Sequence, residues 1–323
     1  MTMNALPTWK DILRAAADGA LETARLEAVR TLFDHLLTDA SLREFTLSAC
    51  NAKLTAGVTN QSEEIWREHF SAADLPRAYL LVTLMCHDEA RANFAANGYP
   101  VEAFDEVWTD LQSWVNHNLR AYGEAGLQRR FYDWYNHHLR SQLVQFGRLQ
   151  FQLNARFDMP RRIARGADGR LLAVAHGESL PSDSVPLLEQ GDSVIAIHIP
   201  EGRPGWLPMT PDECQRSIRR FREFAAHYCT SIPWRALYCH SWLLDEALVK
   251  PLPPQSNIAQ FMRLGGGLYL PGDKPKSEAL WRLFGDAEWP SDGAPLTALQ
   301  RAAVAAVKAG IPLAAGGLVI PRS

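Results

Sequence analysis

The sequence predicts an α/β (α+β) protein made of a helical N-terminal domain over residues 1–125 and a mixed-sheet domain over residues 126–323. The length of 323 residues exceeds the roughly 150 residues of one typical domain, which favours two domains. Residues 1–150 hold 3 Pro and 6 Gly, whereas residues 151–323 hold 17 Pro and 15 Gly. Apolar residues recur at helical steps in the first part, and strand-like segments follow in the second.

The clearest helix is predicted over residues 101–122, where apolar side chains recur at three- and four-residue steps. Weaker versions of the pattern predict helices over residues 20–37, 62–70 and 76–97. A further helix is expected from about residue 127 to residue 146, with Gly147 at its end. The N-terminal part is therefore expected to be helical.

Strand signals begin directly after that last helix. Residues 148–157 are apolar at every odd position and polar at every even one, which predicts a strand. Residues 163–165 and 170–175 flank Gly166-Ala167-Asp168-Gly169, a connection typical of a hairpin. Residues 194–199 are apolar and β-branched enough for a central strand covered on both faces.

A helix and a second central strand are predicted to follow. Thr210-Pro211-Asp212-Glu213 has the pattern of a capping box with Pro at the first helical position, which predicts a helix over residues 210–228. The remaining predicted elements are a strand over residues 236–243, a short helix over 245–248, a helix over 296–309 and a last strand over 318–320.

Charge and composition exclude several classes of function. Lys and Arg total 33 and Asp and Glu total 36, so the net charge of −3 provides no basic field for nucleic acid or an anionic membrane. The longest apolar stretch, residues 302–315, is interrupted and too short to span a bilayer. The N-terminal residues show no secretory signal, so a soluble cytoplasmic protein is expected. The five cysteines are odd in number and form no CxxC pair, which favours free thiols.

His198 is a candidate general base because it ends the predicted central strand, where ligands often bind. An imidazole can take a proton from an attacking amine near neutral pH. The alternative is a strand-end histidine hydrogen-bonded to a carbonyl group, and the sequence leaves both interpretations open.

The next strand carries a second group of candidates. A two-residue period places Cys239 and Ser241 on one face and Tyr238, His240 and Trp242 on the other. A Cys239 thiolate could carry an acyl group, and Ser241 or Tyr238 could protonate a leaving thiolate. The competing interpretation of Cys239, as a small buried core residue, is the favoured one.

Other motifs point to ordinary structure. His117, Asp133 and the pair His137-His138 are not expected to bind a metal, because adjacent helical residues point to different sides. The sequence contains no zinc protease, α/β-hydrolase, P-loop or dinucleotide motif. The Leu264–Gly267 run favours a flexible turn. Five arginines could either contact phosphates or form a solvated face: Arg161, Arg162, Arg165, Arg219 and Arg220.

Several blocks in order carry a family resemblance: FYDWYNHHL with FGRLQFQL, VIAIHIPEG with CQRS, LYCHSWLLDEAL with LPPQSNIAQF, and LTALQR. Over residues 130–301 the chain resembles the two-domain bacterial acyltransferases, which have a helical N-acyltransferase N-terminal domain and a GNAT-like C-terminal domain. The resemblance implies acyl transfer from an acyl-thioester donor, acyl-coenzyme A, to an amine of a small-molecule acceptor. It implies no permanently bound cofactor.

The resemblance also suggests binding residues. GNAT enzymes hold the coenzyme A pyrophosphate with Q/R-x-x-G-x-G/A, and the equivalent loop here, residues 201–209, lacks this motif. A non-catalytic binding protein that has lost coenzyme A is therefore the alternative, and thioester hydrolysis through Cys239 or Ser241 ranks third. The candidate donor contacts are Ile199, Gly202, Arg203, Gly205 and Thr210. The candidate pocket residues are Trp134, Trp206, Trp242 and Asn257.

Overall fold

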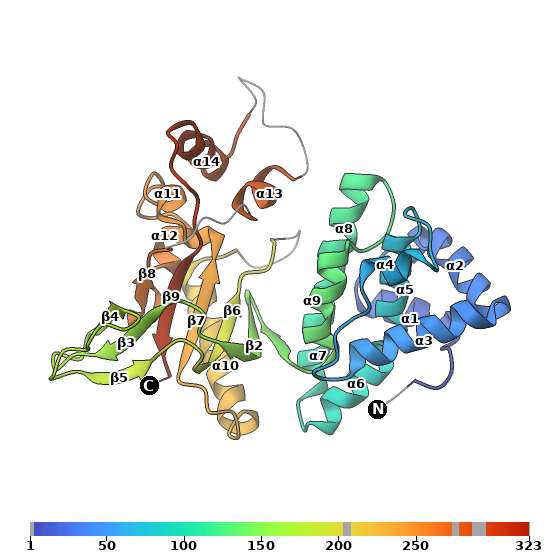
Figure 1. Ribbon diagram of the computed structural model, residues 1–323, viewed down its shortest axis with the longest axis horizontal. Helices are drawn as coiled ribbons and strands as arrows, with labels where there is room; N and C mark the ends of the chain where they lie inside the picture. Colours follow the sequence, from blue (N-terminus) through green and yellow to red (C-terminus); the bar gives the residue numbers. More distant parts are fainter. Residues whose placement is uncertain (1–2, 203–207, 273–277, 286–294, 323) are drawn as a thin grey trace. The chain divides into compact units, whose positions relative to one another are not determined.

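The chain divides into two compact units, residues 1–145 and 146–323. The computed structural model describes residues 3–202, 208–272, 278–285 and 295–322. Unit 1 is helical up to residue 139, and unit 2 contains most of the main sheet (Figure 1). The division falls later than the predicted boundary at residue 125, because α9 (Arg129–Leu139) packs against α3 (Ala40–Leu54) and α5 (Leu75–Met85) of the helical unit.

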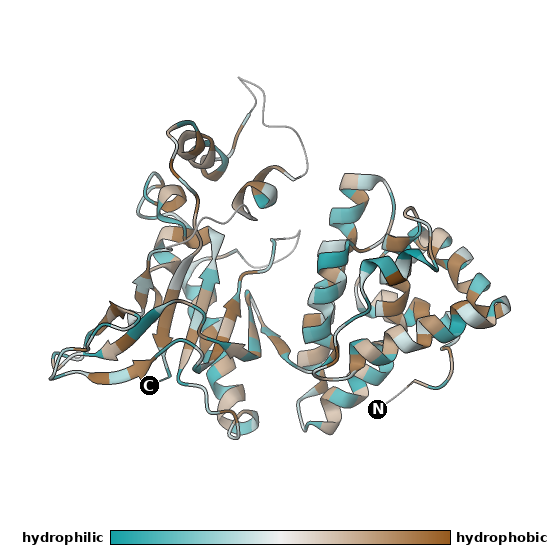
Figure 2. Ribbon diagram, in the orientation of Figure 1, coloured by the Kyte–Doolittle hydropathy of each residue, from teal (hydrophilic) through white to brown (hydrophobic). Residues whose placement is uncertain are grey.

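Unit 1 is built around α5, whose side chains are buried on nearly every side. A helix that is apolar all round belongs in a core, and α5 contacts α1, α2, α3, α6 and α9. The neighbouring helices mix hydrophobic and hydrophilic residues along their length (Figure 2). Their bounds are α1 (Trp9–Asp18), η1 (Thr23–Arg25), α2 (Glu27–Thr38), α4 (Glu63–Arg67), α6 (His87–Ala96), α7 (Val101–Trp108) and α8 (Leu111–Tyr122).

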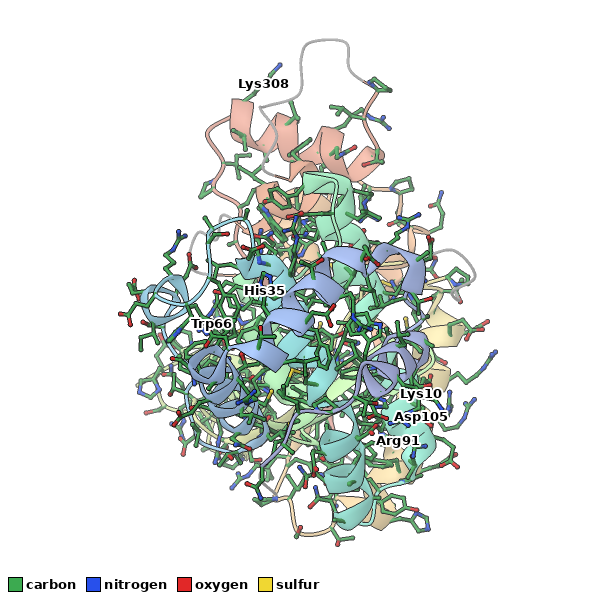
Figure 3. All side chains as sticks on the ribbon, turned by 90° about the vertical axis from the view of Figure 1, so that its right-hand side faces the viewer. Lys10, His35, Trp66, Arg91, Asp105 and Lys308 are labelled. Carbon is green, nitrogen blue, oxygen red and sulfur yellow. The ribbon has the colours of Figure 1, made fainter. Side chains whose placement is uncertain are left out.

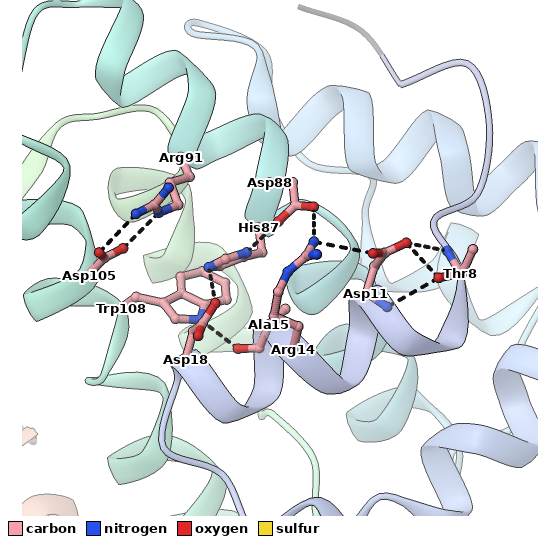
Figure 4. A network of polar contacts seen from close by, with 10 residues as sticks. All are labelled: Thr8, Asp11, Arg14, Ala15, Asp18, His87, Asp88, Arg91, Asp105 and Trp108. Atoms are coloured by element: carbon pink, nitrogen blue, oxygen red, sulfur yellow. Dashed lines mark hydrogen bonds and ion pairs between the residues drawn. The ribbon is translucent and has the colours of Figure 1, made fainter.

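Polar contacts join the first helix of unit 1 to α6 and α7. The indole nitrogen of buried Trp108 donates to the carbonyl oxygen of Ala15 at 2.9 Å (Figure 4). Arg14 contacts Asp88 at the start of α6. Arg91 and Asp105, labelled in Figures 3 and 4, pair at 2.9 Å between α6 and α7. These contacts hold the three helices together.

The helix predicted over residues 101–122 is two helices, because the chain turns at Thr109 and Asp110. The Thr109 hydroxyl donates to the carbonyl oxygen of Glu106 at 2.8 Å. The buried carboxylate of Asp110 accepts a hydrogen bond from the Trp114 indole at 2.9 Å. The apolar stripe continues across this turn, which is why the sequence pattern did not reveal it.

The prediction of a helix up to residue 146 is wrong at its end. Helix α9 ends at Leu139, and Leu143–Phe146 form strand β1. Gly147, at φ +62°, turns the chain into β2 (Leu149–Arg156). A left-handed glycine suits a tight hairpin connection, so Gly147 joins two strands and does not end a helix.

The main sheet has the strand order β1-β2-β6-β7-β9-β8. Strand β6 (Ser193–His198) pairs antiparallel with β2 and parallel with β7 (Ala236–Ser241). Strand β9 (Gly316–Pro321) pairs antiparallel with β7 and with β8 (Leu268–Leu270). The strands predicted over residues 148–157, 194–199, 236–243 and 318–320 are confirmed, as is the α/β class with a mixed sheet.

Strand β2 contains a bulge that changes which side chains share a face. Gln152 pairs with Ala196, but Ala155 pairs with Val194, so β2 uses one residue more than β6 over this interval. A bulge of this kind increases the local twist and bends the strand. The strict alternation of the sequence therefore does not continue through the whole strand.

Helix α10 (Pro211–Tyr228) covers one face of the sheet (Figure 1). The predicted helix and its Thr210 cap are confirmed. Phe221 stacks on Phe151 with ring centroids 4.3 Å apart, and Phe224 packs on Phe146 at 5.3 Å. The other face is covered by a second core that includes Phe157, Met159, Ile163, Tyr238, Leu270 and Val319.

A small sheet of order β4-β3-β5 contributes to that second core. The predicted hairpin is confirmed as β3 (Arg161–Arg165) and β4 (Leu171–Ala175), while β5 (Val185–Leu188) was not predicted. An alanine-rich cluster joins α11 (Glu246–Val249), α13 (Glu278–Phe284) and α14 (Ala298–Lys308). The remaining elements are η2 (Trp242–Leu244), α12 (Asn257–Phe261) and η3 (Leu264–Gly266).

Candidate active site

Two imidazoles lie at the carboxyl ends of the parallel strands β6 and β7. The recorded pairing joins Ile195 to Leu237 and Ala196 to Tyr238. His198 and His240 each follow the last of these pairs by two residues, so both project from the face that carries Tyr238. Ligands of open sheets bind outside the carboxyl ends of parallel strands, which makes this edge the candidate site.

His198 is half-buried and held by strand β2. Its Nε2 lies 2.9 Å from Oε1 of Gln152. Gln152 pairs with Ala196 and Gln150 pairs with His198, so these polar side chains share one face of the sheet. The alternation in β2 thus places glutamines beside the histidine, and this contact fixes the orientation of the imidazole ring.

His240 belongs to a three-residue cluster centred on Asp158, in the link between β2 and β3. One carboxylate oxygen accepts a hydrogen bond from the Tyr238 hydroxyl at 2.7 Å, and the other lies 2.9 Å from Nδ1 of His240. A carboxylate at Nδ1 selects the tautomer that carries its proton there, which leaves Nε2 as a proton acceptor. Sequence reasoning did not identify Asp158, because no spacing signal connects it to β7.

The surroundings of Cys239 weigh against an acyl-enzyme. The side chain is 1% exposed, and burial raises the pKa of its thiol to about 12. On the neighbouring helix, burial raises the pKa of Cys214 to about 11. A thiol with such a pKa stays protonated near neutral pH and is a poor nucleophile. All five cysteines are buried free thiols.

The two hydroxyl candidates on β7 already have structural partners. The Ser241 oxygen accepts a hydrogen bond from the backbone N–H of Leu243 at 3.2 Å and so caps η2. The hydroxyl of buried Tyr238 donates a hydrogen bond to Asp158. Both hydroxyl groups are engaged in hydrogen bonds within the protein, which favours structural roles for both residues.

The loop after β6 is described only in part. Ile199 is half-buried, and Gly202 has open space where a side chain would project. Arg203, Gly205 and Trp206 lie outside the described residues. At the start of α10, Pro211 has no N–H group and the Thr210 hydroxyl accepts the N–H of Glu213 at 3.3 Å. Two of the first backbone donors are therefore unavailable to a phosphate.

The predicted pocket residues belong to different parts of the molecule. Trp134 lies on α9 of unit 1 and packs edge-on against His137, with ring centroids 5.1 Å apart. In unit 2, Trp242 packs against the alanine-rich cluster, whereas Asn257 is the exposed first residue of α12. Within unit 2 the structure therefore places Trp242 and Asn257 on different elements.

A separate groove of about 550 Å³ is lined by Arg165 and by the glycine run, two features for which the sequence suggested a phosphate contact or an ordinary surface role. It is lined by Arg165, Arg170, Arg222 and the run Gly265–Gly267. The guanidinium groups of Arg165 and Arg222 donate to backbone carbonyl oxygens at 3.2 and 2.9 Å, and the Arg170 side chain is 89% exposed. Surface arginines of this kind fit a solvated face.

Within the described residues, no group of three or more His, Cys, Asp or Glu side chains is placed to hold a metal ion. No helix in this part of the chain combines the length and apolar character needed to cross a membrane.

The fold and the site define a two-part α/β protein in which a GNAT-like mixed sheet follows a helical unit. The chain belongs to the GNAT-like C-terminal domain family, which matches residues 143–318. That match extends from the first residue of β1 into β9. No curated protein sequence matches the chain.

Solved acyltransferase structures share the fold of the whole chain. A variant in complex with octanoyl-CoA is 22% identical, has a TM-score of 0.70, and aligns over 98% of this chain and 89% of its own. An acyltransferase in complex with decanoyl-CoA and teicoplanin is 21% identical, with a TM-score of 0.65 over 99% and 90%. A third, in complex with CoA and 10C-teicoplanin, is 22% identical, with a TM-score of 0.62 over 97% and 100%.

Proposed function

We propose that the protein is an acyltransferase that moves an acyl group from acyl-CoA to an amine of a small-molecule acceptor. The observation that carries the proposal is the imidazole of His198, held by Gln152 at the carboxyl end of β6, beside the parallel strand β7. The family and the acyl-CoA or CoA bound in structures of the same fold support the donor class. Acyl-CoA then acts as a co-substrate and not as a resident cofactor.

The reaction needs a proton acceptor beside the nucleophile. The amine nitrogen bonds to the thioester carbonyl carbon, the carbon–sulfur bond breaks, and the sulfur leaves with the electron pair. His198 accepts the proton that the nitrogen loses and returns it to the thiolate. General acid–base catalysis of this type contributes about 10²- to 10⁴-fold to a rate. No covalent enzyme intermediate is needed, which agrees with the buried, protonated Cys239.

Further donor and acceptor contacts are part of the proposal. Among the described residues that follow β6, Ile199, Gly202 and Thr210 are the proposed contacts of the donor. Trp242 and Asn257, both in unit 2, are the proposed acyl or acceptor contacts. The open space at Gly202 supports a close approach to its backbone.

The donor is tested by thermal unfolding with CoA, acetyl-CoA, octanoyl-CoA and decanoyl-CoA. A ligand at 100 times its dissociation constant adds about 2.7 kcal/mol of stability, so a binding donor raises the unfolding temperature. A shift that depends on chain length supports the proposal and identifies the acyl class. The absence of a shift with every thioester contradicts it and favours the binding protein that has lost coenzyme A.

The base is tested with His198→Gln, and exposed His227 on α10 supplies the matched control. Release of CoA thiol in the presence of octanoyl-CoA and an amine measures transfer. We expect His198→Gln to lose about 10²-fold or more of the rate while still binding octanoyl-CoA, and His227→Gln to retain it. Full turnover in a folded His198→Gln protein would remove the assignment.

A further inference from the structure

The cluster of His240, Asp158 and Tyr238 has no part in the proposed reaction of His198, although it lies at the same end of the parallel strands. Nε2 of His240 has no hydrogen-bond partner among the described residues, and the side chain is 19% exposed. Its Nδ1 contacts one oxygen of Asp158, and the other oxygen is occupied by Tyr238. The ring is thus fixed at one nitrogen and open at the other.

Acylation of an alkylamine releases two protons from nitrogen. Near neutral pH the amine is an ammonium ion, which has no lone pair and must lose a proton before it can attack. The nitrogen loses a second proton when the amide forms. One of the two ends on the thiol of CoA and the other is released to water, so a single imidazole that passes its proton to sulfur leaves one proton unaccounted for.

We propose that His240, positioned by Asp158 and Tyr238, accepts the first proton, from the ammonium form of the acceptor. This inference rests on the proposed acyl transfer. Nε2 of His240 takes the proton from nitrogen and frees the lone pair that attacks the thioester carbonyl carbon. His198 takes the second proton and returns it to the leaving sulfur, and His240 then releases the first proton to water.

The surroundings of His240 suit this task. The carboxylate of Asp158 compensates the positive charge that the ring acquires, and its side chain is 56% exposed, which gives water access to the pair. On the other side of β7, His240 pairs with Gly317 of β9, which adds no charge. On β6, the same face carries His198, whose Nε2 lies beside the neutral amide of Gln152. Tyr238 holds the second oxygen of the carboxylate, so Asp158 and Tyr238 are positioning residues.

The test compares two acceptors with octanoyl-CoA as donor at pH 7: ethanolamine, which is an ammonium ion, and hydroxylamine, which is neutral. After subtraction of the uncatalysed rate, we expect His240→Gln to lose about 10²-fold in kcat/KM with ethanolamine and less than about threefold with hydroxylamine. His198→Gln should lose both activities. Exposed His176 supplies the control variant His176→Gln, which should keep both.

The pH profile separates a proton-accepting role from a structural one. Raising the pH deprotonates ethanolamine in solution, so the deficit of His240→Gln with this acceptor should shrink as the pH rises. Asp158→Asn should show the same pattern with a smaller loss. Tyr238→Phe, which keeps the ring and removes the hydroxyl bond to Asp158, should lie between Asp158→Asn and the unmodified protein.

The outcomes distinguish this inference from the function on which it rests. An unmodified protein that acylates both amines, with a His240→Gln variant that is unaffected or loses both activities equally, overturns the role of His240 and leaves acyl transfer intact. An unmodified protein that binds octanoyl-CoA and acylates neither amine overturns both. Loss confined to ethanolamine, and relieved at high pH, supports the inference.

Discussion

The stability of the helical unit should rise with pH between pH 7 and pH 8.5 because of one buried lysine. The side chain of Lys53 on α3 is fully buried, and its Nζ donates to the backbone carbonyl of Tyr132 and, at 3.0 Å, to Oδ1 of Asn136. Nζ lies 3.5 Å from the centroid of the Tyr132 ring. Burial lowers the pKa of Lys53 from 10.5 to about 7.

The sign and size follow from the protons bound in each state. Above pH 7 the folded chain loses the Lys53 proton, whereas the unfolded chain keeps it up to pH 10.5. The unfolded state therefore binds more protons, and the free energy of unfolding rises with pH by at most about 1.4 kcal/mol per unit. Between pH 7 and pH 8.5 the gain is about 1.5 kcal/mol. Below pH 7 the full cost of charging Lys53 remains.

The assay is guanidinium unfolding at pH 7.0, 7.5, 8.0 and 8.5, followed by far-ultraviolet circular dichroism. The matched variant is Lys53→Met, which keeps much of the aliphatic volume and removes the amine. Buried Cys50 has a raised thiol pKa and opposes the rise at higher pH in both proteins, and the charge of Lys53 lowers that pKa only in the unmodified protein. Equal pH slopes for the two proteins would refute the reasoning.

Two further predictions concern unit 2. Cys239→Ala should change the rate of acyl transfer from octanoyl-CoA by less than about threefold, since the protonated thiol takes no part. Loss of transfer in a folded variant that still binds the donor would favour an acyl-enzyme on Cys239. Phe221→Ala should destabilise unit 2 by about 3–5 kcal/mol, because a fully buried ring on α10 is removed from its stack on Phe151. Calorimetry measures that change, and a loss below about 1 kcal/mol would contradict the packing argument.

Local patterns in the sequence were sufficient where one element carries its own signals. Helix α10 follows from its Thr210 cap and apolar stripe, and β2 follows from its alternation. The same patterns failed at β1, because the apolar residues of Leu143–Phe146 fit a continued helix as well as a strand. Pairing with β2 across Gly147 decides between them, and pairing is not a local property.

The candidate site was predicted in the same partial way. The predicted end of β6 singled out His198, and the two-residue period of β7 predicted that His240 shares a face with Tyr238. The contacts of both residues with Asp158 confirm that shared face. Asp158 itself is 80 residues from Tyr238 and 82 from His240, in a link that has no motif. Only the fold brings such residues together, and the bulge in β2 is part of what brings Asp158 to β7.

That bulge sets different tolerances for changes in chain length. The segment from Gln152 to Asp158 includes the extra residue of the bulge, and its length determines which face of the sheet Phe157 and Asp158 reach. A deletion there would restore a regular ladder, but it would turn Phe157 out of the second core and Asp158 away from His240. The turn at Gly166–Gly169 is exposed at its tip and has no such constraint. Insertions and deletions in related chains should therefore accumulate at the hairpin tip and avoid the bulge.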